Sequence, residues 1–212
     1  SCAYNEPFFI KFQGPLDRQL LLQSLELVLL RHEALKLRFD SNQPVQYLDS
    51  SVPYELTEYD WHELTQAQQD QKRDELVLEL GSTPFDLSHG PLVRLHLVCE
   101  STNLNTLYVS AHHIICDGWS WNLMLREIGE TYSASRTGAT AQLPVSGSFL
   151  QEFVELDQRE ETESSLSYWR KVYAEIPDPL NLPTDAPRPP VKVYDGATFT
   201  YEFDPDVVKR LK

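Results

Sequence analysis

The chain has 212 residues, of which 41% are hydrophobic, including nine Phe, ten Tyr and four Trp, so its composition supports a packed core and excludes intrinsic disorder. The formal net charge is −14 and no cluster of Lys and Arg offsets it locally, which excludes nucleic acid as an expected partner because the phosphate backbone is also negative. No uninterrupted apolar run approaches the roughly 18 residues that a membrane span requires, and the three cysteines, which share no CxxC spacing, indicate free thiols in a reducing cytoplasm.

The first part of the chain predicts a strand and then a helix. Residues Pro7–Gln13 are rich in aromatic and apolar side chains and end at the turn signal Gly14-Pro15, as expected of a strand. Asp17 then opens an apolar stretch with helical spacing that runs to about Leu30. Two short strands separated by a turn follow: Leu35–Phe39 and Val45–Leu48, with Gln43-Pro44 between them.

The middle of the chain predicts a polar helix, a strand hairpin and an amphipathic helix. The polar helix is Gln66–Leu80. The two strands are Leu92–Cys99 and Leu107–Ile115, joined by a hairpin turn at Asn103–Asn105. The segment Trp121–Ser133 places its apolar side chains on one helical face, which is typical of a helix that packs on a core.

The last part of the chain predicts a helix, a connector and two short elements. Residues Phe149–Tyr173 are predicted to be helical with an interruption at the acidic stretch Glu160–Glu163. Six prolines from Pro177 to Pro190 predict an extended connector at 177–190, and a strand at Thr198–Phe203 and a helix near Asp206 follow it. This mixture predicts an α/β fold, an α+β layered sandwich with a mixed sheet flanked by helices.

Residue types that carry chemistry are densest between Ala111 and Ser120. His112 and His113 lie at the end of a predicted strand and are followed by an Asp-Gly turn and a helix. Because successive side chains of a strand point to opposite faces, His112 and His113 cannot both face one cavity. One histidine is therefore available for chemistry and the other is packed, and the periodicity alone does not say which.

Four interpretations of this cluster compete. A metal site at His113 and Asp117 is disfavoured, because a strand separates the two by about 13 Å and no second His/Cys pair completes the site, so no metal is expected. A serine hydrolase is disfavoured because the sequence around Ser120 lacks the second glycine of a nucleophile elbow, and Ser120 is better explained as a helix N-cap. Two interpretations remain: a histidine that transfers protons in an acyl transfer, and two buried histidines that are only packed and hydrogen-bonded. Taken alone, the His112-His113 pair favours the structural interpretation.

Four segments in order along the chain resemble the motifs of nonribosomal peptide synthetase condensation domains. The run HHIICDGWS at 112–120 resembles their HHxxxDGWS signature, and RHEALKLRF at 31–39 resembles RHExLRTxF with Lys36 and Leu37 as departures. The residues FDL…GPLVR at 85–94 and YW…LPTDAPRP at 168–189 are similar to two further segments. Order and spacing agree along nearly the whole chain, although the family's first motif, expected just before Ser1, and the motifs of its second lobe are missing.

The resemblance implies a fold similar to chloramphenicol acetyltransferase, with two lobes around a tunnel that admits two carrier-bound thioesters. Residues 1–212 are expected to form the N-terminal lobe, with the C-terminal lobe absent, and to fold without catalysing by themselves. The implied reaction is amide formation by attack of the acceptor amine on the donor thioester. The implied partners are donor and acceptor peptidyl carrier domains, the missing lobe and adjacent synthetase domains. No cofactor is expected to bind directly, because the substrates are attached to the phosphopantetheine arms of the carrier domains.

The resemblance also implies roles for single residues. The second histidine of the signature is the active-site residue of the family, so His113 is the expected catalytic residue, as a base or as a group that positions the amine, and His112 is a packing residue. Asp117 is expected to form a structural salt bridge. Gly118 allows close backbone approach, and its N–H can face a developing oxyanion. Arg31 is either important in the site or part of an ion pair at a helix end. The other supporting motif residues are Trp119 and Ser120.

Other functions remain open at this point. Epimerisation domains and other HHxxxDG acyltransferases share the signature, and Ser120-Trp121 follows it as in many epimerisation domains, but Trp119 and the segment Arg31–Phe39 favour condensation. Cyclisation domains carry aspartates in place of the histidines and do not fit. The non-enzyme alternative is an inactive lobe that docks a carrier, against which the intact His113 and its signature argue.

Overall fold

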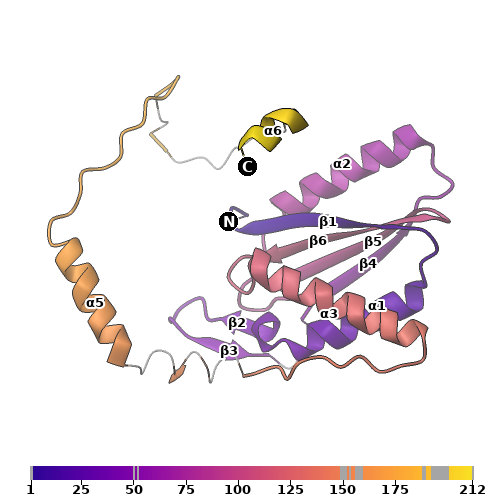
Figure 1. Cartoon of the computed structure of the whole chain (residues 1–212), viewed down its shortest axis with the longest axis horizontal. Coiled ribbons are helices and arrows are strands. Elements are labelled where there is room, and N and C mark those ends of the chain that lie inside the picture. Colours follow the sequence, from indigo (N-terminus) through magenta and orange to yellow (C-terminus); the bar gives the residue numbers. More distant parts are fainter. Residues whose placement is uncertain are drawn as a thin grey trace. The chain divides into compact units, whose positions relative to one another are not determined.

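The computed structural model of the chain describes residues 2–49, 51, 53–148, 152, 154–155, 160–187, 190–191 and 201–211. They divide into two compact units, Ser1–Tyr168 and Trp169–Lys212. The first unit contains a mixed sheet with helices on both faces (Figure 1), so the predicted α/β layered fold is confirmed.

The sheet of the first unit has four strands in the order β1-β6-β5-β4. These strands are β1 (Asn5–Gln13), β4 (Glu55–Asp60), β5 (Val93–Ser101) and β6 (Leu104–His112). β6 pairs antiparallel with both β1 and β5, whereas β4 joins the edge of β5 in parallel. Most residues of the two central strands, β5 and β6, are buried, because helices pack on both faces of the sheet there.

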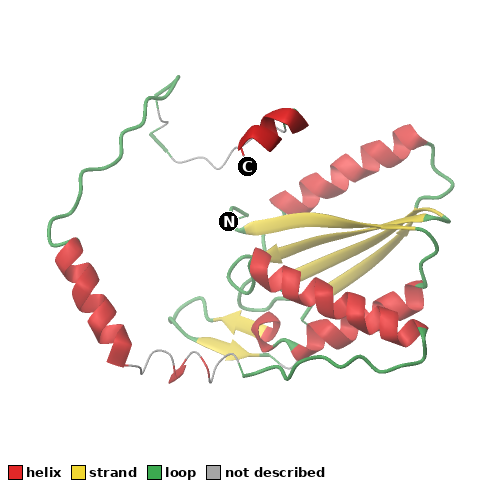
Figure 2. Ribbon diagram, viewed as in Figure 1, coloured by secondary structure: helices red, strands yellow, loops and turns green. Residues whose placement is uncertain are grey.

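Helices cover both faces of this sheet (Figure 2). The helices that cover the sheet are α1 (Arg18–Arg31), α2 (Gln66–Ser82) and α3 (Gly118–Arg136). Side chains of β6 alternate between two clusters: Val109 and Ala111 pack with residues of α1 and α3, whereas Tyr108 packs with Leu76 and Leu80 of α2. The same alternation sends the side chains at the end of β6 to opposite faces.

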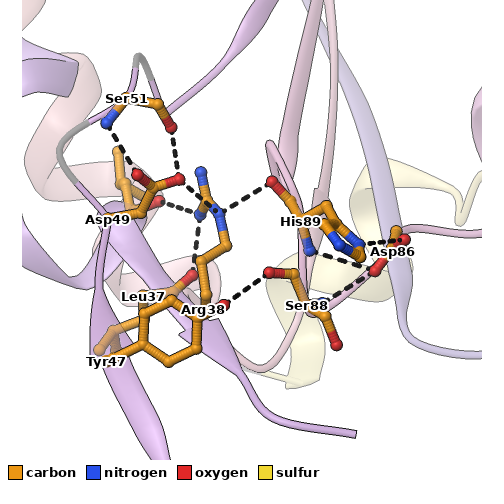
Figure 3. A network of polar contacts seen from close by, with 9 residues as sticks. Leu37, Arg38, Tyr47, Asp49, Ser51, Asp86, Ser88 and His89 are labelled. Atoms are coloured by element: carbon orange, nitrogen blue, oxygen red, sulfur yellow. Dashed lines mark hydrogen bonds and ion pairs between the residues drawn. The ribbon is translucent and has the colours of Figure 1, made fainter.

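A small second sheet stands beside the first and is held by a buried arginine. It pairs β2 (Leu37–Phe39) with β3 (Gln46–Leu48), after a short 3-10 helix, η1 (Glu33–Lys36). Arg38 of β2 is 1% exposed, donates to the carbonyl oxygens of Leu37 at 2.8 Å and His89 at 3.3 Å, and lies 3.4 Å from Asp49 (Figure 3). Arg38 therefore joins the small sheet to the turn that ends at Gly90.

Gly90 is required at this position by its backbone and by Arg38. Its φ is +61°, and a Cβ there would lie 2.4 Å from Cζ and Nε of Arg38. We expect Gly90→Ala to lower the free energy of unfolding by about 2–3 kcal/mol, because backbone strain adds to the displacement of a buried guanidinium. Gly138→Ala is the matched control: Gly138 has φ +72° but open space around its Cβ, so it reports the backbone strain of about 1 kcal/mol alone. Equal losses of stability in the two variants, measured by urea unfolding, would contradict the role of Arg38.

Several predicted helix and strand boundaries differ from those in the structure. The strand expected from Leu35 begins as η1, and the strand expected to reach Ile115 ends at His112, where the chain turns. The strand β4 was not predicted, because its exposed sheet-edge position leaves it rich in polar side chains. The acidic stretch Glu160–Glu163 is itself helical, since α5 runs from Glu160 to Val172, whereas most of the predicted helix before it, residues 149–151, 153 and 156–159, lies outside the described residues.

Beyond α5 the described residues contain one further element. Residues 173–187 and 190–191, which include most of the Pro-rich segment, carry no helix or strand. The short helix α6 spans Pro205–Leu211, as predicted near Asp206. The strand expected at Thr198–Phe203 lies partly outside the described residues, and residues 201–203 are not in a strand. No helix in the described part of the chain combines the length and the apolar character needed to cross a membrane.

Candidate active site

The two histidines lie at the C-terminal end of β6, where backbone hydrogen bonds hold both of them. The backbone N–H of His112 donates to the carbonyl of Leu92 at 3.0 Å, and that of His113 donates to the carbonyl of Tyr4 at 2.9 Å. His112 is 7% exposed, whereas the side chain of His113 is 47% exposed. The two side chains therefore have different environments, as strand alternation predicts, and the structure identifies His113 as the accessible one.

Both ring nitrogens of His113 face acceptors. Nδ1 lies 3.0 Å from the carbonyl oxygen of Cys116, and because a carbonyl only accepts, Nδ1 carries the hydrogen. Nε2 lies 3.1 Å from Oε1 of Glu6, which belongs to β1. The backbone turn between His113 and Cys116 thus orients the ring and leaves Nε2 as the nitrogen that can accept a proton when the ring is neutral.

His112 is a structural residue. Its Nδ1 accepts a hydrogen bond from the backbone N–H of Ile114 at 3.1 Å, and its ring packs near Tyr4 and edge-on to Phe85. Burial is the main cause that lowers the pKa of His112 below its usual value. The ring is therefore neutral at pH 7 and stabilises the turn that carries His113.

Asp117 is the N-cap of α3. Its Oδ1 accepts hydrogen bonds from the backbone N–H and the hydroxyl of Ser120 at 2.8 and 2.7 Å, and its own N–H donates to Oγ of Ser120 at 3.3 Å. This capping box corrects the prediction that Ser120 is the N-cap, because Ser120 instead occupies the third helical position. None of the ion pairs seen among the described residues includes Asp117, so the structure shows its capping role, and the expected salt bridge, with a partner in the missing lobe, stays a prediction.

The turn also changes the distance argument between His113 and Asp117. Residues 113–115 form a turn and not a strand, so Asp117 is not carried away along the sheet. Hydrogen bonds from Ser120 lower the pKa of the Asp117 carboxyl most, and the charge of His113 contributes a smaller lowering. Among the residues that the structure describes, no three His, Cys, Asp or Glu side chains are grouped to hold a metal ion.

We expect Asp117→Ala to lower the melting temperature by a few degrees, whereas Asp117→Asn keeps most of the stability because asparagine is also a good N-cap. Since the pKa of the folded carboxyl is lowered, its stabilising effect is complete above the unfolded value of about 3.9 and is lost as the pH falls through the folded value. Thermal unfolding of the three proteins between neutral and acidic pH tests this. An unchanged melting temperature in Asp117→Ala together with lost activity would instead indicate a direct role in the reaction.

Open space lies beside the start of α3. Apart from Gly118, its chain neighbours and the backbone of its own helix, no atom of the described residues comes within 4 Å of the position that a Cβ on Gly118 would occupy, and Trp119 is 84% exposed. A pocket of about 160 Å³ next to it is lined by residues of both the 31–39 and the 112–120 segments, among them His32, Cys116 and Trp119. Burial raises the pKa of the Cys116 thiol to about 12, so this cysteine stays protonated and is no nucleophile at neutral pH.

The end of α1 is fixed to α3 by a buried carboxylate. Glu127 of α3 is 3% exposed; its Oε1 lies 2.6 Å from Nη1 of Arg31 and its Oε2 lies 2.8 Å from Nε2 of His32. Arg31 also donates to the carbonyl oxygen of Pro144. Of the two roles open to Arg31, the structure shows the ion pair at a helix end.

Sequence reasoning missed the acidic partners of these basic residues. Glu6 was not singled out because no pattern marks it, and it meets His113 only through the pairing of β1 with β6. Glu127 follows a weak signal, a charged residue among apolar neighbours of an amphipathic helix, which indicates a buried ion pair when a basic partner is near.

The chain matches the family model of the condensation domain over residues 1–212. It is 32% identical over 215 residues to a linear gramicidin synthase from Brevibacillus parabrevis, and this match covers 99% of the chain but 3% of that protein. It is 30% identical over 217 residues to chondramide synthase cmdD from Chondromyces crocatus, covering 100% of the chain and 6% of that protein. The chain thus spans a small part of these relatives.

The solved structures agree at the level of the fold. The starter condensation domain of the rhizomide synthetase RzmA aligns with a TM-score of 0.74 at 22% identity, covering 84% of this chain and 44% of that one. This is the chloramphenicol acetyltransferase-like fold that the motifs imply. Because the family model matches the whole chain and this fold carries its motifs in order, the chain belongs to the condensation-domain family.

Proposed function

We propose that this chain is the N-terminal lobe of a peptide synthetase condensation domain that joins a donor acyl or peptidyl thioester to the amine of an acceptor aminoacyl thioester. The observation that carries the proposal is the accessible His113, whose Nδ1 is fixed by the carbonyl of Cys116. The remaining wall of the tunnel comes from a C-terminal lobe outside these residues, since the chain spans 44% of the solved condensation domain. Donor and acceptor carrier domains deliver the substrates on phosphopantetheine arms.

In this reaction His113 moves one proton. The amine lone pair attacks the thioester carbon, and Nε2 takes a proton from the nitrogen as the new C–N bond forms. The C–S bond then breaks, and the same proton passes to the leaving sulfur, so that the products are one amide and one thiol. Because an α-amino group has a pKa of about 7.7–8.0, part of it is already neutral at pH 7. Positioning the two thioesters supplies much of the rate, so residues 1–212 alone are expected to be inactive.

The test uses the intact protein with a donor carrier bearing an acyl thioester and an acceptor carrier bearing an aminoacyl thioester. Mass spectrometry of the acceptor carrier detects the transferred acyl group, and an acceptor with an acetylated amine serves as the control without a nucleophile. Amide formation supports the proposal. Exchange of the α-hydrogen with solvent deuterium without amide formation would support epimerisation instead, and carrier binding without either reaction would support a docking lobe.

Epimerisation has no supporting observation of its own in this structure. The Ser-Trp pair that suggested it is explained locally: Ser120 completes the capping box of Asp117, and Trp121 is buried and packs edge-on against Phe8 of β1. Condensation therefore remains the function that the site supports best.

A further inference from the structure

The carboxylate of Glu6 lies beside Nε2 of His113, the nitrogen that accepts a proton in the proposed reaction. Oε1 is 3.1 Å from Nε2, and both side chains are partly exposed, at 34% and 47%. Since Nδ1 donates to Cys116, a neutral ring presents only a lone pair at Nε2. Two acceptors then face each other, and the arrangement is satisfied only when a donor hydrogen lies between them.

The backbone places Glu6 at this spot rigidly. Glu6 pairs with Ala111 across β1 and β6, and its neighbour Asn5 pairs with His112. The amide of Asn5 donates to the carbonyl of Thr83 at 2.9 Å, and Phe8 packs against Trp121 on the same face as Glu6. Because both sides of this segment are fixed, only the flexible side chain of Glu6 can adjust.

We propose that Glu6 and His113 together recognise a primary amine as the acceptor: one N–H donates to Oε1 of Glu6, the other donates to Nε2 of His113, and the lone pair points at the thioester. This inference rests on the proposed function and deepens it by adding Glu6 as a second residue that holds the acceptor amine. A nitrogen that donates to two acceptors at ordinary distances holds them about 4.7 Å apart. The exposed Glu6 side chain reaches that separation by rotating away by about 1.6 Å. A secondary amine has a single N–H and satisfies only one of the two acceptors.

The charged groups around His113 agree with this arrangement. Glu6 approaches from β1, Asp117 lies at the start of α3, and the neutral His112 precedes it on β6. The two acidic groups favour an incoming cationic or hydrogen-bond-donating nitrogen. Oδ1 of Asp117 accepts from the backbone N–H and hydroxyl of Ser120, whereas Glu6 is the carboxylate that lies at Nε2 of His113, so Glu6 is the acceptor placed beside an incoming amine.

The test compares Glu6→Ala and Glu6→Gln with the wild type in the intact protein. Each of the standard amino acids is loaded on the acceptor carrier, and the best primary-amine acceptor is then compared with its N-methyl derivative. We expect Glu6→Ala to slow transfer to the primary amine by at least about tenfold, the loss of one hydrogen bond to a charged group, and transfer to the N-methyl acceptor by much less. The rate with the primary amine divided by the rate with the N-methyl acceptor should therefore be lower in Glu6→Ala than in the wild type. Glu6→Gln should give an intermediate ratio.

The matched control is Glu63→Gln. Glu63 is exposed and lies 2.8 Å from Nε2 of the exposed His62, so it reproduces the removal of a carboxylate beside a histidine away from this site. It should leave both rates unchanged. If Glu6→Ala slows transfer to both acceptors equally, or slows transfer to neither, the inference is overturned while the proposed function stands. Absence of amide from the wild-type protein with every acceptor refutes the proposed function and this inference with it.

Discussion

His113→Ala is expected to reduce amide formation by at least about a hundredfold, because a positioned proton-transfer group contributes about 10² to 10⁴ to the rate. The fold should survive the change, since the side chain is 47% exposed and its contacts are with the carbonyl of Cys116 and with Glu6. Initial rates with loaded donor and acceptor carriers, measured beside thermal unfolding, give both quantities. Near-normal transfer by a folded His113→Ala protein would remove the proton-handling role.

His113→Gln separates the two roles that His113 can have. The glutamine amide reaches the position of Nε2 and can accept a hydrogen bond from the amine, but it does not take up a proton at neutral pH. If His113 mainly orients the amine, the glutamine variant retains far more activity than the alanine variant. If His113 accepts the proton, both variants are similarly slow.

Glu127→Ala is expected to have the largest effect on stability, lowering the free energy of unfolding by about 3 kcal/mol. The side chain of Glu127 is buried and pairs with Arg31 at 2.6 Å and with His32 at 2.8 Å, so its removal leaves a largely buried guanidinium without a counter-charge. Urea unfolding at pH 7 measures the loss. A decrease below about 0.5 kcal/mol, the range of an exposed ion pair, would show that this cluster does not fix α1 to α3.

Two further variants separate charge pairing from helix composition. Glu130→Ala removes a carboxylate of the same helix that is 49% exposed and 4.0 Å from Arg126, and it should cost less than about 0.5 kcal/mol. In the Arg31→Met background the cost of Glu127→Ala should shrink, because the buried partner is already gone. An undiminished cost in that background would place the effect of Glu127 in its other contacts.

The sequence alone determined the family and most of the elements around the site. The alternation of Leu92–Cys99 and the strand character of Leu107–Ile115 predicted β5 and β6, and helical spacing after Asp17 predicted α1. These signals are local: a strand or helix shows its period within a few residues. Strand alternation also predicted that His112 and His113 differ in environment, and the family resemblance pointed to His113.

Boundaries at the site depended on contacts that a local pattern does not contain. The chain turns after His112, where Nδ1 of this residue accepts the N–H of Ile114 and Nδ1 of His113 meets the carbonyl of Cys116. A run of apolar residues predicted a longer strand because periodicity does not register such hydrogen bonds. Likewise, Asp117 and Ser120 are both good caps, and only their reciprocal bonding decided that α3 begins after Asp117.

By itself, then, the sequence determined the motifs, the layered α/β class and the candidate histidine, because residue types and short periods are properties of the chain. Only the tertiary structure decided which acids meet which bases. Glu6 reaches His113 through the register of β1 on β6, and Glu127 reaches Arg31 through the packing of α3 on α1. Such pairs join residues far apart in the sequence, so strand register and helix packing select the partners. For the buried Glu127 a counter-charge is also needed, because an unpaired charge in the core is costly.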